Sequence, residues 1–157
     1  ARRRFCTVRN LWVIGNCAAA AALLASGCSS SPPEYTPSDG ELPAGTAQIS
    51  INGQDAGTTG AVQCNTTEWL TTISTGDQTA GINTLVSNRD DLAVETVSIN
   101  NLGGFTGTYT ADVGPTGGEA EIAMAGRTYQ ISGTADGFST DEPSFRVPAT
   151  FTIKVAC

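Results

Sequence analysis

The stretch Phe151-Thr152-Ile153-Lys154-Val155-Ala156-Cys157 shows the clearest alternation of apolar and polar residues in the sequence. A period of two is that of a β-strand, because successive side chains of a strand point to opposite faces of the sheet. The four odd-numbered residues are therefore expected to face a core, and Thr152 and Lys154 to face solvent. The stretch predicts a half-buried β-strand.

Shorter runs of the same alternating kind begin at about residue 46, and Gly, Asn, Asp and Pro separate them. The runs are 48–51, 62–64, 69–73, 92–100, 105–110, 120–124 and 128–132, and an ambiguous run covers 79–87. Eight or nine short strands at this spacing, without a sustained helical period, predict an all-β domain over residues 47–157. We expect an antiparallel β-sandwich or a barrel-like sheet.

Local signals predict details of this sheet. The dipeptide Asn52-Gly53 supplies a tight turn, and residues 114–118, Gly-Pro-Thr-Gly-Gly, supply another strong turn. Within 92–100 the apolar face switches between Val94 and Val97, and this change predicts a β-bulge or a bend.

The first 27 residues have the layout of a lipoprotein signal peptide. Four arginines lie before residue 10, the apolar run 11–24 follows, and the small residues Ala25-Ser26-Gly27 precede Cys28. A basic start, a short apolar run and a small-residue cleavage site direct export. An apolar run of about 14 residues, at about 1.5 Å each, is too short to cross a hydrocarbon core of about 30 Å.

Cys28 is expected to become the new N-terminus and to carry a diacylglyceryl group, which anchors the protein on the extracytoplasmic side of the membrane. Two acyl chains anchor a protein stably where one chain is marginal. Ala25 stands where such motifs prefer leucine, and Leu24 lies one place earlier. The alternative is an ordinary secretory signal peptide that happens to end before a cysteine.

Residues 28–46 hold four of the chain's seven prolines and almost no apolar side chains. Such a segment buries too little surface to offset the entropy that it loses on ordering. We therefore predict a disordered tether between the lipidated cysteine and the β domain.

The charge of the exported part excludes some classes of partner. All fifteen acidic residues lie after Cys28, whereas only Arg89, Arg127, Arg146 and Lys154 of the eight basic residues do. The exported part therefore has a net charge near −11, which repels nucleic acid and anionic lipid headgroups. Nucleic acid is excluded as a partner, and membrane attachment requires the covalent anchor.

The remaining cysteines predict a disulfide. Cys6 and Cys17 lie in the segment expected to be removed, which leaves Cys64 and Cys157 as a pair in an oxidising compartment. The alternation around each of them points inward, so we expect a buried bridge. Two buried free thiols are the alternative. A zinc site falls short, because two cysteines without a histidine do not supply four ligands.

The sequence contains no histidine, which excludes Ser-His-Asp and Cys-His catalysis and histidine-ligated metals. Glu119 with Glu121 resembles a glycosidase pair, and Asp90-Asp91 and Asp141-Glu142 contain calcium ligands, but solvated strand edges and loop tips explain all of them better. Lys154 could imitate the lysine of a Ser-Lys dyad, although an outward-facing strand lysine is the default. We predict no enzyme activity, no cofactor and no metal.

Six segments share a further pattern: 26–30 (SGCSS), 51–55 (INGQD), 59–64 (TGAVQC), 79–82 (TAGI), 129–137 (YQISGTADG) and 151–157 (FTIKVAC). In order and spacing they resemble the mycobacterial nineteen-kilodalton lipoprotein antigen family, and the resemblance covers nearly the whole chain. It implies a surface lipoprotein of the cell envelope without known catalytic activity. Cys28 matches the lipidated position, and Cys64 with Cys157 matches the structural pair.

The resemblance implies further properties of the protein. Family members are cell-envelope antigens whose acylated N-terminus is sensed by host Toll-like receptor 2, and ligand transport and adhesion have been suggested for them. O-glycosylation would fall on Thr36, Ser38 or Thr46. The tether departs from the threonine-rich family tethers, because it is richer in proline and acidic residues.

Three functions therefore compete. The first is a non-enzymatic lipoprotein displayed on the outer face of the membrane. The second is a carrier of a lipid or small apolar ligand, which needs an enclosed cavity in the sandwich or barrel. The third is a hydrolase of envelope polymers, which needs a concave carboxylate pair such as Glu119 with Glu121.

Overall fold

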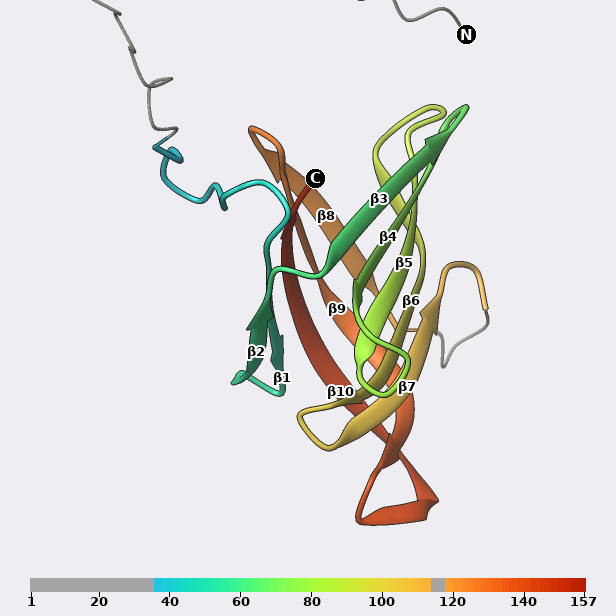
Figure 1. Cartoon of the computed structure of the whole chain (residues 1–157). Coiled ribbons are helices and arrows are strands. Elements are labelled where there is room, and N and C mark those ends of the chain that lie inside the picture. Colours follow the sequence, from blue (N-terminus) through green and yellow to red (C-terminus); the bar gives the residue numbers. More distant parts are fainter. Residues whose placement is uncertain (1–35, 114–117) are drawn as a thin grey trace, which may run out of the picture. The chain divides into compact units, whose positions relative to one another are not determined.

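The computed structural model describes residues 36–113 and 118–157, and these ranges contain ten antiparallel strands (Figure 1). The strands are β1 (Ala47–Ile51), β2 (Gln54–Thr59), β3 (Val62–Thr67), β4 (Leu70–Gly76), β5 (Gly81–Ser87), β6 (Ala93–Leu102), β7 (Phe105–Thr110), β8 (Ala120–Ala125), β9 (Thr128–Ser139) and β10 (Glu142–Ala156). The all-β prediction is confirmed. The described residues include no helix that is long and apolar enough to cross a membrane.

The strands form one sheet in the order β2-β1-β10-β9-β7-β6-β5-β4-β3, and β8 pairs with the first half of β9. The sheet curls until it is a nearly closed barrel, with β2 and β3 as its two edges (Figure 1). In such a sheet, alternate side chains of each strand point into the barrel and form the core.

The alternation at residues 151–155 is confirmed in β10. Its apolar side chains are buried, whereas Thr152 is exposed and Lys154 is half-buried on the outer face. The ring of Phe151 packs at a tilt against that of Tyr109, with 6.5 Å between the ring centroids. Such an aromatic pair contributes about 0.5–1.5 kcal/mol beyond the area that it buries.

β1 and β2 form a hairpin at the turn predicted from Asn52-Gly53. Both turn residues have a positive φ, 50° at Asn52 and 75° at Gly53, as a type I′ turn requires. The sequence did not indicate β2 itself. Its residues QDAGTT offer the core only the small side chain of Ala56, so they lack the apolar alternation of a strand.

The predicted irregularity in the run 92–100 is a register shift between β5 and β6. Residues 85–86 of β5 pair with Thr96 and Val94, so Glu95 has no partner on β5. One extra residue reverses the alternation of a strand. Val94 and Val97 are consequently both buried.

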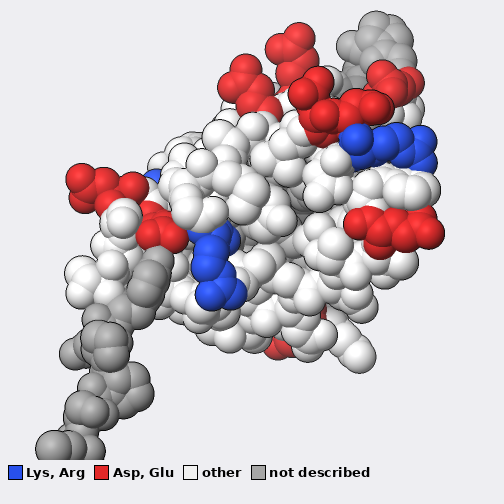
Figure 2. Space-filling view, turned by 90° about the horizontal axis from the view of Figure 1, so that it is seen from above, with Lys and Arg blue, Asp and Glu red and all other residues white. Residues whose placement is uncertain are grey.

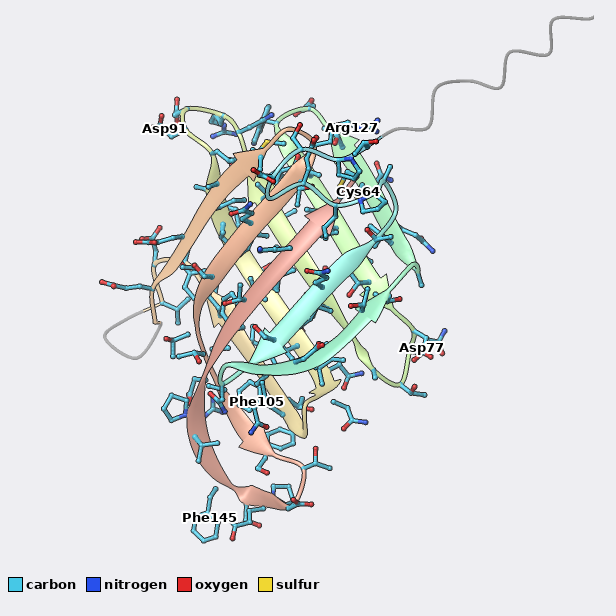
Figure 3. The ribbon with its side chains drawn as sticks, turned by 90° about the vertical axis from the view of Figure 1, so that its left-hand side faces the viewer. Cys64, Asp77, Asp91, Phe105, Arg127 and Phe145 are labelled. Atoms are coloured by element: carbon cyan, nitrogen blue, oxygen red, sulfur yellow. A yellow bond between two sulfur atoms is a disulfide. The ribbon has the colours of Figure 1, made fainter. Side chains whose placement is uncertain are left out.

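β9 and β10 extend beyond the barrel as a two-stranded hairpin, which the sequence pattern does not indicate (Figures 1 and 3). All residues from 140 to 148 are exposed, among them Phe145 at 67% and Val147 at 39%. Near the base of the hairpin, Arg146 pairs with Asp136 at 2.6 Å. Within residues 36–113 and 118–157 no second layer covers the hairpin, and its apolar side chains are exposed.

Two apolar residues of the predicted runs do not reach the core. Trp69 lies in the turn between β3 and β4 and is 37% exposed, and Met124 lies near the end of β8 and is 48% exposed. Most of the predicted turn at 114–118 lies outside the described residues. Gly118, its last residue, is described and has a φ of 68°.

Candidate functional site

Cys28, the predicted lipidation site, lies outside the described residues. The described segment that precedes β1 lies at one end of the barrel, hereafter the entry end. The entry end comprises residues 38–46, the β8–β9 turn at Gly126-Arg127 and the Cys64–Cys157 disulfide. Figure 3 shows Cys64 and Arg127 at this end and Phe145 at the opposite end.

Residues 38–46 are hydrogen-bonded to the sheet. The Leu42 N–H donates to Thr128 Oγ1 at 2.8 Å, and Thr128 is fully buried beneath this contact. The Gly45 N–H donates to the Ala156 carbonyl oxygen, and the Ala156 N–H donates to the Thr46 carbonyl oxygen, both at 2.9 Å. The last residues of the predicted tether thus have partners on β9 and β10, which composition alone does not reveal.

Glu41 connects this segment to the β8–β9 turn. Its Oε1 accepts the Arg127 N–H at 3.2 Å, and its Oε2 accepts the Ser38 N–H at 3.1 Å. Gly126 has a φ of +56°, and a Cβ there would overlap the Glu41 side chain. A glycine is therefore needed both for the turn and for the approach of the carboxylate. Nothing in the sequence signals a contact between residues 86 positions apart.

The predicted disulfide is present, with 5.8 Å between the Cα atoms of Cys64 and Cys157. The expectation that the bridge is buried is wrong, because Cys64 is exposed and Cys157 only half-buried. β3 is an edge strand, so the opening of the barrel exposes even its inward-facing side chains. The bridge joins β3 to the end of β10 across that opening. Arg127 Nη2 also donates to the Cys157 carbonyl oxygen at 2.7 Å.

Acidic side chains gather around the rim of the entry end, with few basic ones among them (Figure 2). Arg89 stacks over the Trp69 ring at 4.0 Å, in a depression whose lining also includes Asp90 and Asp91. Asp90 and Asp91 are exposed. In the described part of the chain, no group of three or more potential ligands could hold a metal ion.

The carboxylate pairs singled out in the sequence occupy exposed positions. Glu119 and Glu121 are exposed at the start of β8, and Asp141 and Glu142 are exposed at the tip of the β9–β10 hairpin. Lys154 lies half-buried on the outer face of β10. A carboxylate pair that catalyses hydrolysis lines a cleft that excludes water, and these exposed pairs lack such a cleft. These positions do not favour a hydrolase.

Two side chains with shifted pKa values also lack an arrangement for acid–base chemistry. Hydrogen bonds from the Thr79 hydroxyl and from the Thr79 and Ala80 N–H groups lower the pKa of the exposed Asp77. Burial, followed by nearby carboxylates, raises the pKa of the Tyr109 hydroxyl. At neutral pH Asp77 is therefore ionised and Tyr109 protonated, so neither is poised to exchange a proton.

The interior of the barrel is filled by side chains. Ile73, Ile99, Ile131, Phe151 and Ile153 are each at most 2% exposed. Depressions of about 350, 370 and 460 Å³ in the described ranges lie on the outer face and open to solvent. A filled interior does not favour the carrier hypothesis, because a lipid needs an enclosed apolar space.

The candidate O-glycosylation residues lie in the segment before β1. Thr36 and Ser38 are exposed, whereas Thr46 is half-buried and its hydroxyl donates to the Pro43 carbonyl oxygen at 2.5 Å. Glycosylation of these residues stays a prediction.

Glu41→Ala is expected to loosen the chain around Ser38 and the β8–β9 turn at Arg127, and to leave the barrel folded. It removes the acceptor of two backbone N–H groups, at a cost to stability of about 1 kcal/mol because the contact is near the surface. Hydrogen exchange followed by mass spectrometry should show faster exchange at Ser38 and Arg127. Asp39→Ala is the matched control and should change nothing. Unaltered exchange in Glu41→Ala would refute the role given to this carboxylate.

Comparison with known proteins places these features in context. Residues 40–157 match the family model described as the Mycobacterium 19 kDa lipoprotein antigen. A protein of Mycobacterium indicus pranii named "Putative lipoprotein" is 35% identical over 151 residues, which cover 96% of this chain and 100% of the relative. Lipoprotein LpqH of Mycobacterium tuberculosis is 32% identical over 110 residues, which cover 70% of this chain and 68% of the relative. Lipoprotein LpqH of Mycobacterium avium is 33% identical over 114 residues.

Proposed function

The chain belongs to the Mycobacterium 19 kDa lipoprotein antigen family, and on this premise we propose that a diacylglyceryl group on Cys28 anchors it to the outer face of the cell membrane. The barrel is then a non-enzymatic domain displayed on the outside. The observation that carries the proposal is the sequence of residues 1–28, a basic start, a short apolar run and a small-residue cleavage site before a cysteine.

The geometry of the entry end supports a short tether. Residues 29–37 separate Cys28 from Ser38, which is hydrogen-bonded to Glu41. Fully extended, the chain from Cys28 to Ser38 spans at most about 36 Å. The entry end is thus held near the membrane, and its acidic rim is repelled by anionic headgroups. Attachment by the lipid, combined with repulsion of the domain, keeps the barrel off the bilayer surface.

The direction of β10 supports display of the opposite end. Ala156 lies at the entry end, and Glu142 lies at the other end of the same strand. With the entry end toward the membrane, the β9–β10 hairpin with the exposed Phe145 points away from the cell. We extend the proposal to host Toll-like receptor 2, which would sense the acylated N-terminus rather than the barrel.

Cys28→Ala is expected to move the protein from the detergent phase to the aqueous phase in a detergent phase-separation experiment, because it removes both acyl chains. Mass spectrometry of the unaltered protein should find the added lipid mass on the peptide that begins at Cys28. Cys17→Ala is the matched control, since that cysteine lies in the signal peptide and should leave partitioning unchanged. Detergent-phase partitioning of Cys28→Ala, once mass spectrometry shows that residues 1–27 have been removed, would overturn the anchoring proposal.

A further inference from the structure

A depression of about 350 Å³ lies on the outer face of β7, β9 and β10, and no residue of the entry end lines it. The register of the strands arranges its side chains in two rows near the base of the hairpin. Thr106, Phe138 and Arg146 form one row, and Thr108 lies beside Asp136 in the next. An aromatic ring, an ion pair and threonine hydroxyl groups therefore line the same open depression. Together these groups come from three strands.

The ion pair has a defined geometry and spare hydrogen-bonding capacity. Arg146 Nε and Nη2 both donate to Asp136 Oδ2, at 2.9 and 2.6 Å. No other described residue is hydrogen-bonded to Asp136 Oδ1 or to Arg146 Nη1, so Oδ1 remains an acceptor and Nη1 a donor. The Arg146 side chain is 72% exposed, so the pair contributes little to stability and can be changed without unfolding the barrel.

The Thr hydroxyl groups extend the same capacity along β7. Thr106 Oγ1 accepts the Asn101 N–H at 3.0 Å, so its O–H is left to donate. Thr108 is exposed, and Thr110 lies further along the lining of the depression. Phe138 is half-buried and presents an apolar surface beside these polar groups.

The charged and polar groups that line this depression exclude most classes of ligand. An anion would contact a guanidinium whose charge Asp136 already neutralises. The net negative charge of the protein would also repel the anion. A metal ion would have one carboxylate as a ligand, and Arg146 already neutralises the charge of that carboxylate. An apolar ligand would strip water from hydroxyl groups without replacing their hydrogen bonds, which is unfavourable.

We propose that this depression binds a neutral carbohydrate. Sugar hydroxyl groups both donate and accept, so they match Asp136 Oδ1, Arg146 Nη1 and the threonine hydroxyls. The face of an aromatic ring carries negative partial charge and attracts the polarised C–H groups of a pyranose, which is the role of Phe138. Because the hollow is shallow and covers one side of a sugar, the Kd is expected in the millimolar range.

The test is a titration of the ¹⁵N-labelled mature chain carrying Cys28→Ala with methyl α-D-glucopyranoside, methyl α-D-mannopyranoside and methyl β-D-galactopyranoside. At least one glycoside, at tens of millimolar, should shift the amide signals of Thr108, Gly137 and Phe138. The absence of shifts with all three, or shifts centred on another face, overturns the proposal. Equal shifts with inorganic phosphate would overturn it as well, because the site would then recognise charge.

Phe138→Leu keeps an apolar side chain but removes the ring, and is expected to weaken binding about tenfold, as loss of a contact contributing about 1.4 kcal/mol does. Phe145→Leu is the matched control, because it changes the same residue type on the same hairpin outside the depression. Equal affinities of the two variants overturn the assignment of Phe138.

Discussion

Replacing both Cys64 and Cys157 with serine is expected to lower the free energy of unfolding of the barrel by about 4–5 kcal/mol. The bridge joins residues 93 positions apart. A cross-link that closes a loop of this length removes much of the conformational entropy of the unfolded chain. For a domain of this size the same loss lowers the Tm by about 20 °C.

The position of the disulfide in the sheet determines what the measured loss of stability reports. Cys64 lies on β3, which has β4 as its neighbour in the sheet, and Cys157 lies across the opening of the barrel. Because Cys64 is exposed, serine there creates little cavity, and the measured loss reports the cross-link rather than packing. Hydrogen exchange should also accelerate along β3, since β4 alone then holds it.

Equilibrium urea unfolding measures the effect, with Trp69 as the reporter. Trp69 is the one tryptophan that follows the predicted signal peptide. The unaltered protein in excess reductant is the matched comparison and should lose the same stability as the double variant. A loss under about 1 kcal/mol in both samples would mean that the unfolded chain gains little freedom when the bridge is absent.

Local chemistry decides the features of this fold that the sequence predicts well. Asn52-Gly53 forms a turn because both residues accept a positive φ. Residues 151–155 form a half-buried strand because apolar side chains recur with the period of a sheet. The register shift at Glu95 can be predicted from the sequence, because one extra residue reverses the alternation of apolar and polar side chains on either side of it.

Long-range contacts decide the rest. β2 has almost no apolar pattern and is a strand because β1 lies beside it. Residues 38–46 have the composition of a tether, yet hydrogen-bond partners about 90 residues away hold them. The pairing of the cysteines follows from elimination, but the exposure of Cys64 follows from strand order, which alternation does not encode. Cys28 stays a sequence prediction, because it lies outside the described residues.

Gly137→Ala is expected to lower the free energy of unfolding by about 3 kcal/mol, at the upper end of the usual cost of overpacking. Gly137 pairs with Gly107 between β9 and β7, and the Phe105 ring covers both from the core. A Cβ on Gly137 would overlap the carbonyl oxygen of Thr106 and lie 2.5 Å from the Cα of Gly107. Backbone atoms cannot turn away as a flexible side chain can, so β7 and β9 must move apart.

Gly60→Ala is the matched control for this prediction. A Cβ on Gly60 meets no atom within 4 Å, and its φ lies outside the left-handed region. Both variants remove the same glycine freedom from the unfolded chain, so their difference in urea unfolding isolates the clash. Gly60→Ala should change the free energy of unfolding by no more than about 0.5 kcal/mol. Equal effects of the two variants would mean that β7 moves away from β9 at little cost in free energy. The depression beside Thr108 and Asp136 would then lack the rigid backbone that a binding site needs.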